Sequence, residues 1–95
     1  MNMRERPSRS SSLRLFEGLT DVDPEICSNK IRALLRARRL GRRMTQAELA
    51  LRLGKVQSFV NKIELGDRSL HMNDFLQICK ALGASPMNVL RHALR

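Results

Sequence analysis

Apolar residues recur every three or four positions along most of the chain, the spacing that gathers side chains on one face of an α-helix. The first such stretch, about residues 23–40, has its apolar positions at Ile31, Leu34 and Leu35. Asp23 fits an N-cap and Pro24 the favoured first helical position. We therefore predict a helix that ends near Gly41, with its apolar stripe inward and its arginines outside.

Two short helices are predicted next. Thr45-Gln46-Ala47-Glu48 has the pattern of a capping box, in which the hydroxyl and the carboxylate each bind a free backbone amide. This helix ends at Gly54, because glycine adopts a positive φ at low cost. A third helix follows almost at once and stops at Gly66, and its apolar positions are Phe59, Val60 and Ile63.

The remaining pattern predicts two more helices. One runs from Met72 to Leu82 and ends before Gly83, and its expected inward residues are Phe75, Leu76, Cys79 and Leu82. Ser85-Pro86 resembles an N-cap followed by the first helical residue, so a short helix is expected over about 86–94. Five helices without a strand pattern predict an all-α bundle over residues 23–95.

The first 22 residues differ from the rest. Their opening, MNMRERPSRSSS, is rich in Ser and Arg and has no apolar periodicity, so a disordered, flexible tail is expected. Leu13, Leu15, Phe16 and Leu19 follow it. Two interpretations stay open for these four, a short docked strand or helical turn, or an unstructured connection to the first helix.

The basic residues are concentrated in the middle of the chain. The 95 residues include 18 Lys and Arg against 9 Asp and Glu, a net charge of +9. Residues 30–62 contain a single acid, Glu48, and carry the whole excess of positive charge. Charge runs are commonly solvated helix faces. A run that carries all of the net charge is better explained by an anionic partner, which means nucleic acid or an anionic membrane face.

Composition excludes several other functions. The chain has no Trp, no Tyr and 3 Phe, which argues against recognition of single strands by aromatic stacking. No apolar run reaches the length of a membrane span. Cys27, Cys79, His71 and His92 lack a zinc-site spacing, and no catalytic grouping stands out, so we expect no metal, no cofactor and no enzymatic activity.

Residues 46–64, QAELALRLGKVQSFVNKIE, place two short helices around one tight turn at Gly54. Small Ala50 would let these helices cross closely. This segment resembles the helix-turn-helix of phage repressor and Cro proteins. The resemblance to the Cro/C1-type family extends over about residues 26–90, and its blocks are Leu35-Arg36 with Arg39, MTQAELALRLG, QSFVNKIELGDR and FLQICKALG. It implies a five-helix, lambda-repressor-like DNA-binding domain whose helix-turn-helix occupies about residues 45–64.

Three positions depart from the family pattern. Lys55 follows Gly54 where the family usually has an apolar residue, Val56 replaces a capping residue before the third helix, and His71 replaces a small or acidic cap before the fourth. One interpretation is that Val56 fills the apolar position while Lys55 turns to solvent or phosphate.

The start of the third helix carries the predicted base contacts. In a helix-turn-helix, the N-terminal residues of the second helix of the motif meet base edges in the major groove. These residues are Val56, Gln57, Ser58 and, one turn on, Asn61. Gln57 and Asn61 suit adenine, and Val56 suits a thymine methyl group. The alternative for Gln57 and Asn61 is that they are ordinary solvated polar residues.

Other polar residues suit the DNA backbone. The expected phosphate contacts are Arg42, Arg43, Gln46, Lys55, Lys62 and Arg68. By resemblance, Gln46 contacts the backbone and braces Gln57, and Arg39 and Glu64 form a structural ion pair. Arg42 and Arg43 have the alternative interpretation of ordinary loop charges. Phe59 shares a face with Val60 and Ile63, so we expect it to be partly buried.

Two classes of function follow from these observations. The first is a sequence-specific regulator of transcription, a repressor that binds a palindromic operator in double-stranded DNA as a homodimer. It would act in the cytoplasm on the nucleoid, away from any membrane, and its expected dimer surface is the last helix, with Met87, Val89, Leu90 and Leu94. The alternative is a protein-binding module of the same fold, such as an antitoxin or anti-activator, with residues 1–22 reaching a protein partner.

Overall fold

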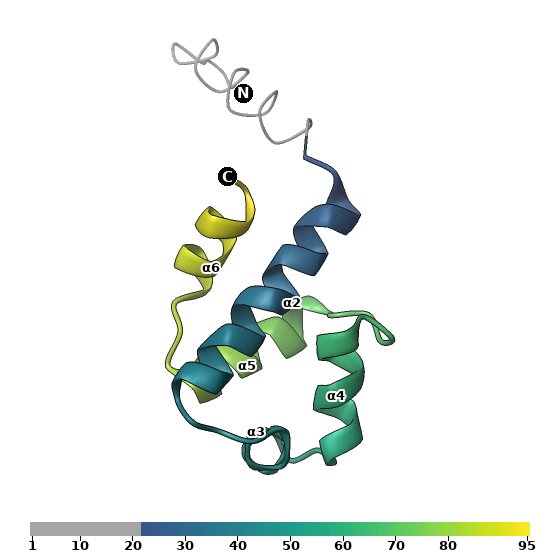
Figure 1. Cartoon of the computed structure of the whole chain (residues 1–95), viewed down its shortest axis with the longest axis vertical. Helices are drawn as coiled ribbons and strands as arrows, with labels where there is room; N and C mark the ends of the chain where they lie inside the picture. Colours follow the sequence, from purple (N-terminus) through teal and green to yellow (C-terminus); the bar gives the residue numbers. More distant parts are fainter. Residues whose placement is uncertain (1–21) are drawn as a thin grey trace, which may run out of the picture.

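The computed structural model describes residues 22–95, which form five helices and no strand. Their labels and bounds are α2 (Pro24–Gly41), α3 (Gln46–Leu53), α4 (Gln57–Leu65), α5 (Met72–Leu82) and α6 (Pro86–Ala93) (Figure 1). The predicted all-α fold is confirmed, and the helices end where the capping residues indicate. The expectations for the N-terminal tail concern residues 1–21, which lie outside the described residues.

Helix α2 is the longest element and crosses the domain diagonally, with α6 beside its upper half and α3 below its lower end (Figure 1). The Asp23 carboxylate caps it by accepting from the amides of Glu25 and Ile26 at 2.9 and 3.1 Å. The C-terminus of the chain returns to α2, where Lys30 Nζ donates to the carbonyl of Arg95 at 3.3 Å. No helix in the described part is both long and apolar enough to span a membrane.

The connection between α3 and α4 is a tight turn. The predicted capping box is present, with Glu48 N donating to Thr45 Oγ1 at 3.0 Å and Thr45 N donating to Glu48 Oε1 at 2.7 Å. Gly54 then adopts φ 69°, and the amide of Lys55 donates to the carbonyl of Ala50 at 2.8 Å. Ala50 is only 1% exposed, so its small side chain is buried, as the predicted close crossing of α3 and α4 requires.

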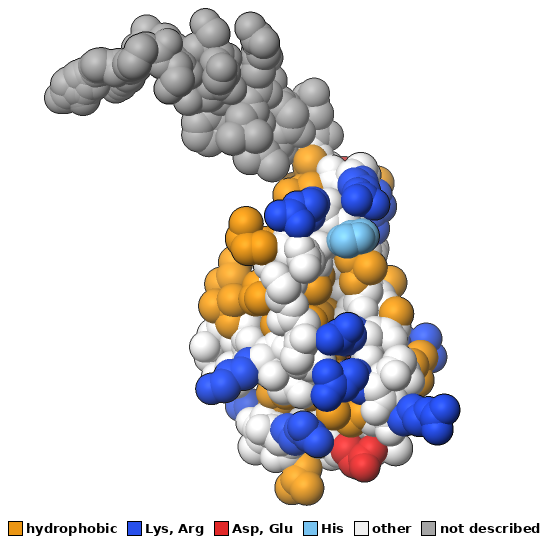
Figure 2. Space-filling view, turned by 90° about the vertical axis from the view of Figure 1, so that its left-hand side faces the viewer, with side chains coloured by type: hydrophobic (Ala, Val, Ile, Leu, Met, Phe, Trp, Pro, Cys, Tyr) orange, Lys and Arg blue, Asp and Glu red, His pale blue; other side chains and the backbone are white. Residues whose placement is uncertain are grey.

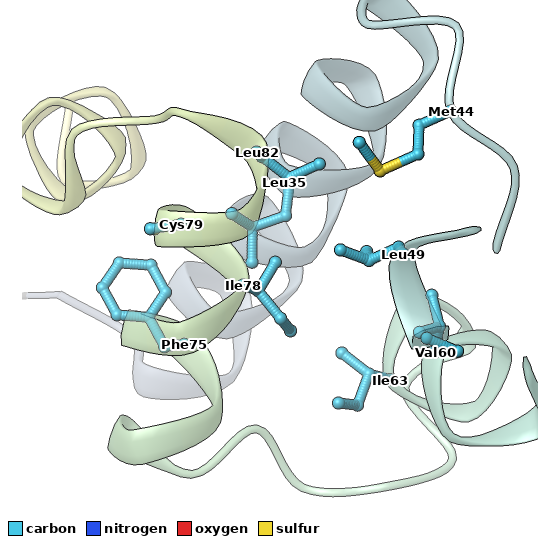
Figure 3. Packing of buried hydrophobic residues seen from close by; sticks show 10 residues of the cluster. Leu35, Met44, Leu49, Val60, Ile63, Phe75, Ile78, Cys79 and Leu82 are labelled. Carbon is cyan, nitrogen blue, oxygen red and sulfur yellow. The ribbon is translucent and has the colours of Figure 1, made fainter. Parts of the chain in front are cut away.

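The hydrophobic core lies between α2, α3, α4 and α5 (Figure 3). The described residues that form it are Leu35, Met44, Leu49, Ala50, Val60, Ile63, Phe75, Ile78, Cys79 and Leu82. The prediction that Leu76 points inward is wrong, because it is 46% exposed while Ile78 is 3% exposed. Positions 75, 78, 79 and 82 follow the spacing of one helix face, whereas Leu76 lies about 100° around the helix from Phe75.

The expectation that the arginines of α2 all lie outside is also wrong for one of them. Arg39 is 5% exposed and reaches between α2, α3 and α4. A guanidinium is buried in this way only when its donors are satisfied. Arg39 Nη1 donates to the carbonyl of Met44 at 2.8 Å, which holds the turn before α3 against the end of α2.

Candidate nucleic-acid interface

The first turn of α4 is exposed to solvent. Gln57 and Ser58 are exposed, and Val56, immediately before the helix, is 70% exposed. The interpretation that Val56 fills an apolar position is therefore wrong. Val56 also makes no side-chain capping bond. The helix thus presents one apolar and two polar side chains at an uncapped N-terminus, where a partner has direct access to them.

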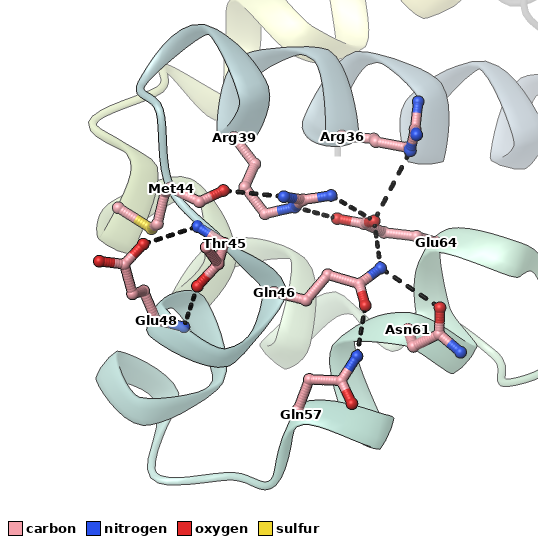
Figure 4. Close-up of polar contacts among 9 residues, drawn as sticks. All are labelled: Arg36, Arg39, Met44, Thr45, Gln46, Glu48, Gln57, Asn61 and Glu64. Atoms are coloured by element: carbon pink, nitrogen blue, oxygen red, sulfur yellow. Dashed lines mark hydrogen bonds and ion pairs between the residues drawn. The ribbon is translucent and has the colours of Figure 1, made fainter.

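A chain of amide hydrogen bonds connects this exposed turn to α3 (Figure 4). Gln57 Nε2 donates to Gln46 Oε1, which is the bracing contact expected from the resemblance. Gln46 Nε2 donates in turn to Glu64 Oε1 at 2.9 Å and to Asn61 Oδ1 at 3.3 Å. Gln46 therefore ties together the start, middle and end of α4.

The series of hydrogen bonds ends at a buried ion pair. Arg39 Nε and Nη2 donate to the two carboxylate oxygens of Glu64 at 2.6 and 2.9 Å, and both side chains are nearly buried. Arg36 lies farther from Glu64, at 3.8 Å, and its side chain is 58% exposed. Burial alone would raise the pKa of Glu64, but the hydrogen bonds from Arg39 and Gln46 and the nearby arginine charges outweigh it and lower that pKa. Glu64 is therefore ionised at neutral pH.

The ionised carboxylate determines how the amides are oriented. Because a carboxylate only accepts hydrogen bonds, Gln46 must turn its NH₂ group towards Glu64 and its carbonyl oxygen towards Gln57. Gln57 must then use its NH₂ group for Gln46, which leaves its own carbonyl oxygen free. The amide nitrogen of Asn61 likewise points away from Gln46 (Figure 4). Glu64 thus sets which atoms of Gln57 and Asn61 are available to a partner.

The cations predicted to contact phosphate are placed around this site in different ways. Arg43 and Lys62 are exposed, and Arg43 adopts φ 55°, a left-handed conformation that is rare for a residue other than glycine. Lys55 and Arg68 are also exposed, and both lie over the ring of Phe59. Phe59 is partly buried and packs against the core, as expected. Figure 2, which views the domain from the side of α6, shows Lys and Arg side chains spread over the lower part of that face with an acidic side chain among them.

Arg42 differs from these cations because it is engaged within the fold. Its Nη1 donates to the carbonyl of Leu82 at 3.2 Å, and a Cβ added at Gly83 would lie 2.8 Å from that nitrogen. Arg38 binds the same end of α5, with Nη2 donating to the carbonyl of Gly83 at 2.8 Å. Cations at a helix C-terminus bind its free carbonyls and oppose its negative end. The sequence pattern contains no signal for this role, because the partners are backbone atoms about 40 residues away.

A family model described as helix-turn-helix matches residues 35–88, more than half of the chain. The chain belongs to the Cro/C1-type helix-turn-helix family. The matched range contains α3, the turn at Gly54 and α4 in full, together with the Arg39–Glu64 pair. Searches of the curated proteins and of the solved structures gave no match. This membership supports a DNA-binding regulator with double-stranded DNA as its partner.

Proposed function

We propose that this helix-turn-helix protein is a sequence-specific transcriptional repressor that binds a palindromic operator as a homodimer, without cofactor, metal or catalytic activity. It would act in the cytoplasm on the nucleoid. The observation that carries the proposal is the chain of hydrogen bonds that runs from the buried Arg39–Glu64 pair through Gln46 to the exposed Gln57. Such a chain orients a base-reading side chain before DNA arrives, so less conformational entropy is lost on binding.

Direct readout follows from the atoms that remain free. Gln57 offers its carbonyl oxygen and the second hydrogen of its NH₂ group, which match the N6 donor and N7 acceptor of adenine in the major groove. Exposed Val56 offers methyl groups to the methyl of a thymine, and Ser58 offers a hydroxyl to either kind of base. Asn61 offers its NH₂ group, because its carbonyl oxygen already accepts from Gln46. This arrangement favours a base that presents a hydrogen-bond acceptor to Asn61.

Phosphate contacts would hold α4 in the groove. We assign them to Arg43, Lys55, Lys62 and Arg68, and to Gln46 at the N-terminus of α3, where free backbone amides favour an anion. We leave Arg42 out of this set because its Nη1 donates to the carbonyl of Leu82, although the residue is exposed. Contacts of this kind fix orientation and give the salt dependence of binding, whereas sequence preference comes from the base contacts.

Dimerisation through α6 would supply the second half-site. Met87 is 66% and Leu94 39% exposed, while Val89 and Leu90 are half-buried beside α2 and the core. One domain reads only a few base pairs, and two half-sites about one helical turn apart multiply both affinity and specificity. A second copy that covers α6 would also bury these exposed apolar side chains.

Selection of binding sites from random duplexes, followed by paired titration at fixed salt, tests the proposal. We expect selection to yield an inverted repeat, and we expect the wild-type protein to bind it at least ~10³-fold more tightly than a random duplex. Equal binding to both duplexes would contradict sequence-specific reading and favour the protein-binding module. A selected site without an inverted repeat, bound by one copy, would contradict the homodimer alone.

A further inference from the structure

The two ends of α4 each supply a cation to one aromatic ring. Lys55 precedes the helix and Arg68 follows it, in the loop that joins α4 to α5 (Figure 1). Lys55 Nζ lies 5.2 Å and Arg68 Cζ 4.7 Å from the centre of the Phe59 ring. Both distances are within the range of a cation–π interaction. We call these three residues the Phe59 clamp.

The backbone that carries Arg68 is itself fixed. The amide of Arg68 donates to the carbonyl of Lys62 at 3.2 Å, and Arg32 Nη2 donates to the carbonyl of Arg68 at 2.9 Å. Phe59 is anchored because it packs against the core. The guanidinium of Arg68 is therefore held by its loop on one side and by the ring on the other, although the residue is exposed.

The charges of the clamp remain uncompensated within residues 22–95, where the ion pairs involve only Arg36 and Arg39 with Glu64. Two cations near the same ring repel one another, and the negative faces of the ring offset only part of that repulsion. An anion bound beside them would remove the rest. In a DNA-binding protein, the anion that suits this place beside α4 is a backbone phosphate.

We propose that Phe59 is a positioning residue, which holds Lys55 and Arg68 in place to bind phosphates of the DNA backbone. The proposal rests on the function proposed above and extends it to a residue that does not itself touch the DNA. Long side chains lose rotamer freedom when they bind phosphate, and cations already held on a ring lose less. Phe59 would thus increase the affinity for all duplexes and leave sequence preference unchanged.

The test is a thermodynamic cycle on the full chain, with a labelled random-sequence duplex as probe over a range of KCl concentrations. Phe59→Leu keeps an apolar side chain without the π face, and we expect it to weaken binding about three- to tenfold. Phe59→Tyr keeps the ring and should bind within about twofold of wild type. In a Lys55→Gln/Arg68→Gln background, Phe59→Leu should cause no further loss. An equal loss in both backgrounds, or no rescue by Tyr, would overturn the positioning role.

A second measurement does not depend on the variants or on DNA. In the free wild-type protein, the side-chain protons of Arg68 and Lys55 should show ring-current shifts in NMR spectra, because both side chains lie over Phe59. Unshifted resonances would overturn the clamp even if Phe59→Leu failed to fold. Wild-type protein that binds no duplex would contradict the proposed function. Wild-type protein that binds normally, with no coupling in the cycle, would contradict only the clamp.

Discussion

Arg42 and Arg43 are neighbours in the turn after α2, yet their side chains have different environments. Arg42 donates to the carbonyl of Leu82, whereas the Arg43 side chain forms no hydrogen bond or ion pair with residues 22–95. The same division separates the other cations near the site. Arg38, Arg39 and Arg42 donate to groups of other helices, whereas the side chains of Arg43, Lys55, Lys62 and Arg68 form no hydrogen bond within residues 22–95. The net charge of +9 includes both sets, and we propose that only the second binds DNA.

Arg39→Met should have the largest effect, because it removes the partner of a nearly buried carboxylate. Breaking a buried pair from one side costs about 3–5 kcal/mol of unfolding free energy, since the remaining charge is uncompensated. Urea denaturation followed by circular dichroism measures this loss. Arg36→Met is the matched control, with a half-exposed side chain 3.8 Å from the same carboxylate, and should cost at most about 1 kcal/mol. Similar losses for both variants would contradict the distinction between the buried Arg39 and the half-exposed Arg36.

Gln57→Ala should separate specific from non-specific binding. The variant loses the base-reading amide but keeps every cation, so the affinity for the selected operator should fall by about 1–3 kcal/mol. The affinity for a random duplex should hardly change, and the preference at one base pair per half-site should relax. Fluorescence anisotropy with both duplexes gives the two affinities. If both affinities fall together, Gln57 contributes to general binding and the proposed readout is wrong.

Most of the fold was predictable because helix ends carry local signals. Asp23, the Thr45–Glu48 capping box and Gly54 act within one turn of the backbone, and each acts where the pattern placed it. The sequence predicts less well which residues of a helix face the core, as Leu76 and Ile78 show, because several adjacent apolar residues fit one stripe about equally well. Tertiary packing decides between them, and packing depends on residues far along the chain.

The site was predictable for residues with a family role and not for those defined by tertiary contacts. The Arg39–Glu64 pair and the bracing of Gln57 by Gln46 are present as the resemblance implied. The sequence contains no signal for the contacts of Arg42 and Arg38 with the end of α5, since the local pattern does not distinguish these two from the other arginines of the stretch. The exposure of Val56 and the stacking of Lys55 on Phe59 likewise depend on how the turn at Gly54 directs each side chain.

Acid should weaken the Arg39–Glu64 ion pair, because it protonates the Glu64 carboxylate. The pKa of Glu64 is lowered from its ordinary value of 4.5, so its ionisation contributes stability fully above that value. This contribution is lost as the pH falls below 4.5 and through the folded-state pKa. A ¹³C NMR titration of the Glu64 carboxyl group, with thermal unfolding at each pH, tests this. A folded-state pKa at or above 4.5 would contradict the role of the arginines around Glu64.

Arg43→Gly should weaken DNA binding without destabilising the fold. The φ of 55° at Arg43 is unfavourable for a side chain and free of cost for glycine. Relief of this strain opposes the greater entropy of glycine in the unfolded chain, so the unfolding free energy should stay level or rise by up to about 1 kcal/mol. Thermal denaturation measures the change. A clear loss of stability would show that Arg43 is an anchoring residue.

The most direct test compares Arg42→Gln with Arg43→Gln, two neighbouring substitutions of the same chemistry. We expect Arg43→Gln to reduce the slope of log affinity against log salt by about one unit on a random duplex, as one phosphate contact is lost. Arg42→Gln should leave this slope unchanged and lower the melting temperature, because α5 loses a donor at its C-terminus. Equal changes of slope for the two variants, or a change for Arg42→Gln alone, would contradict the account.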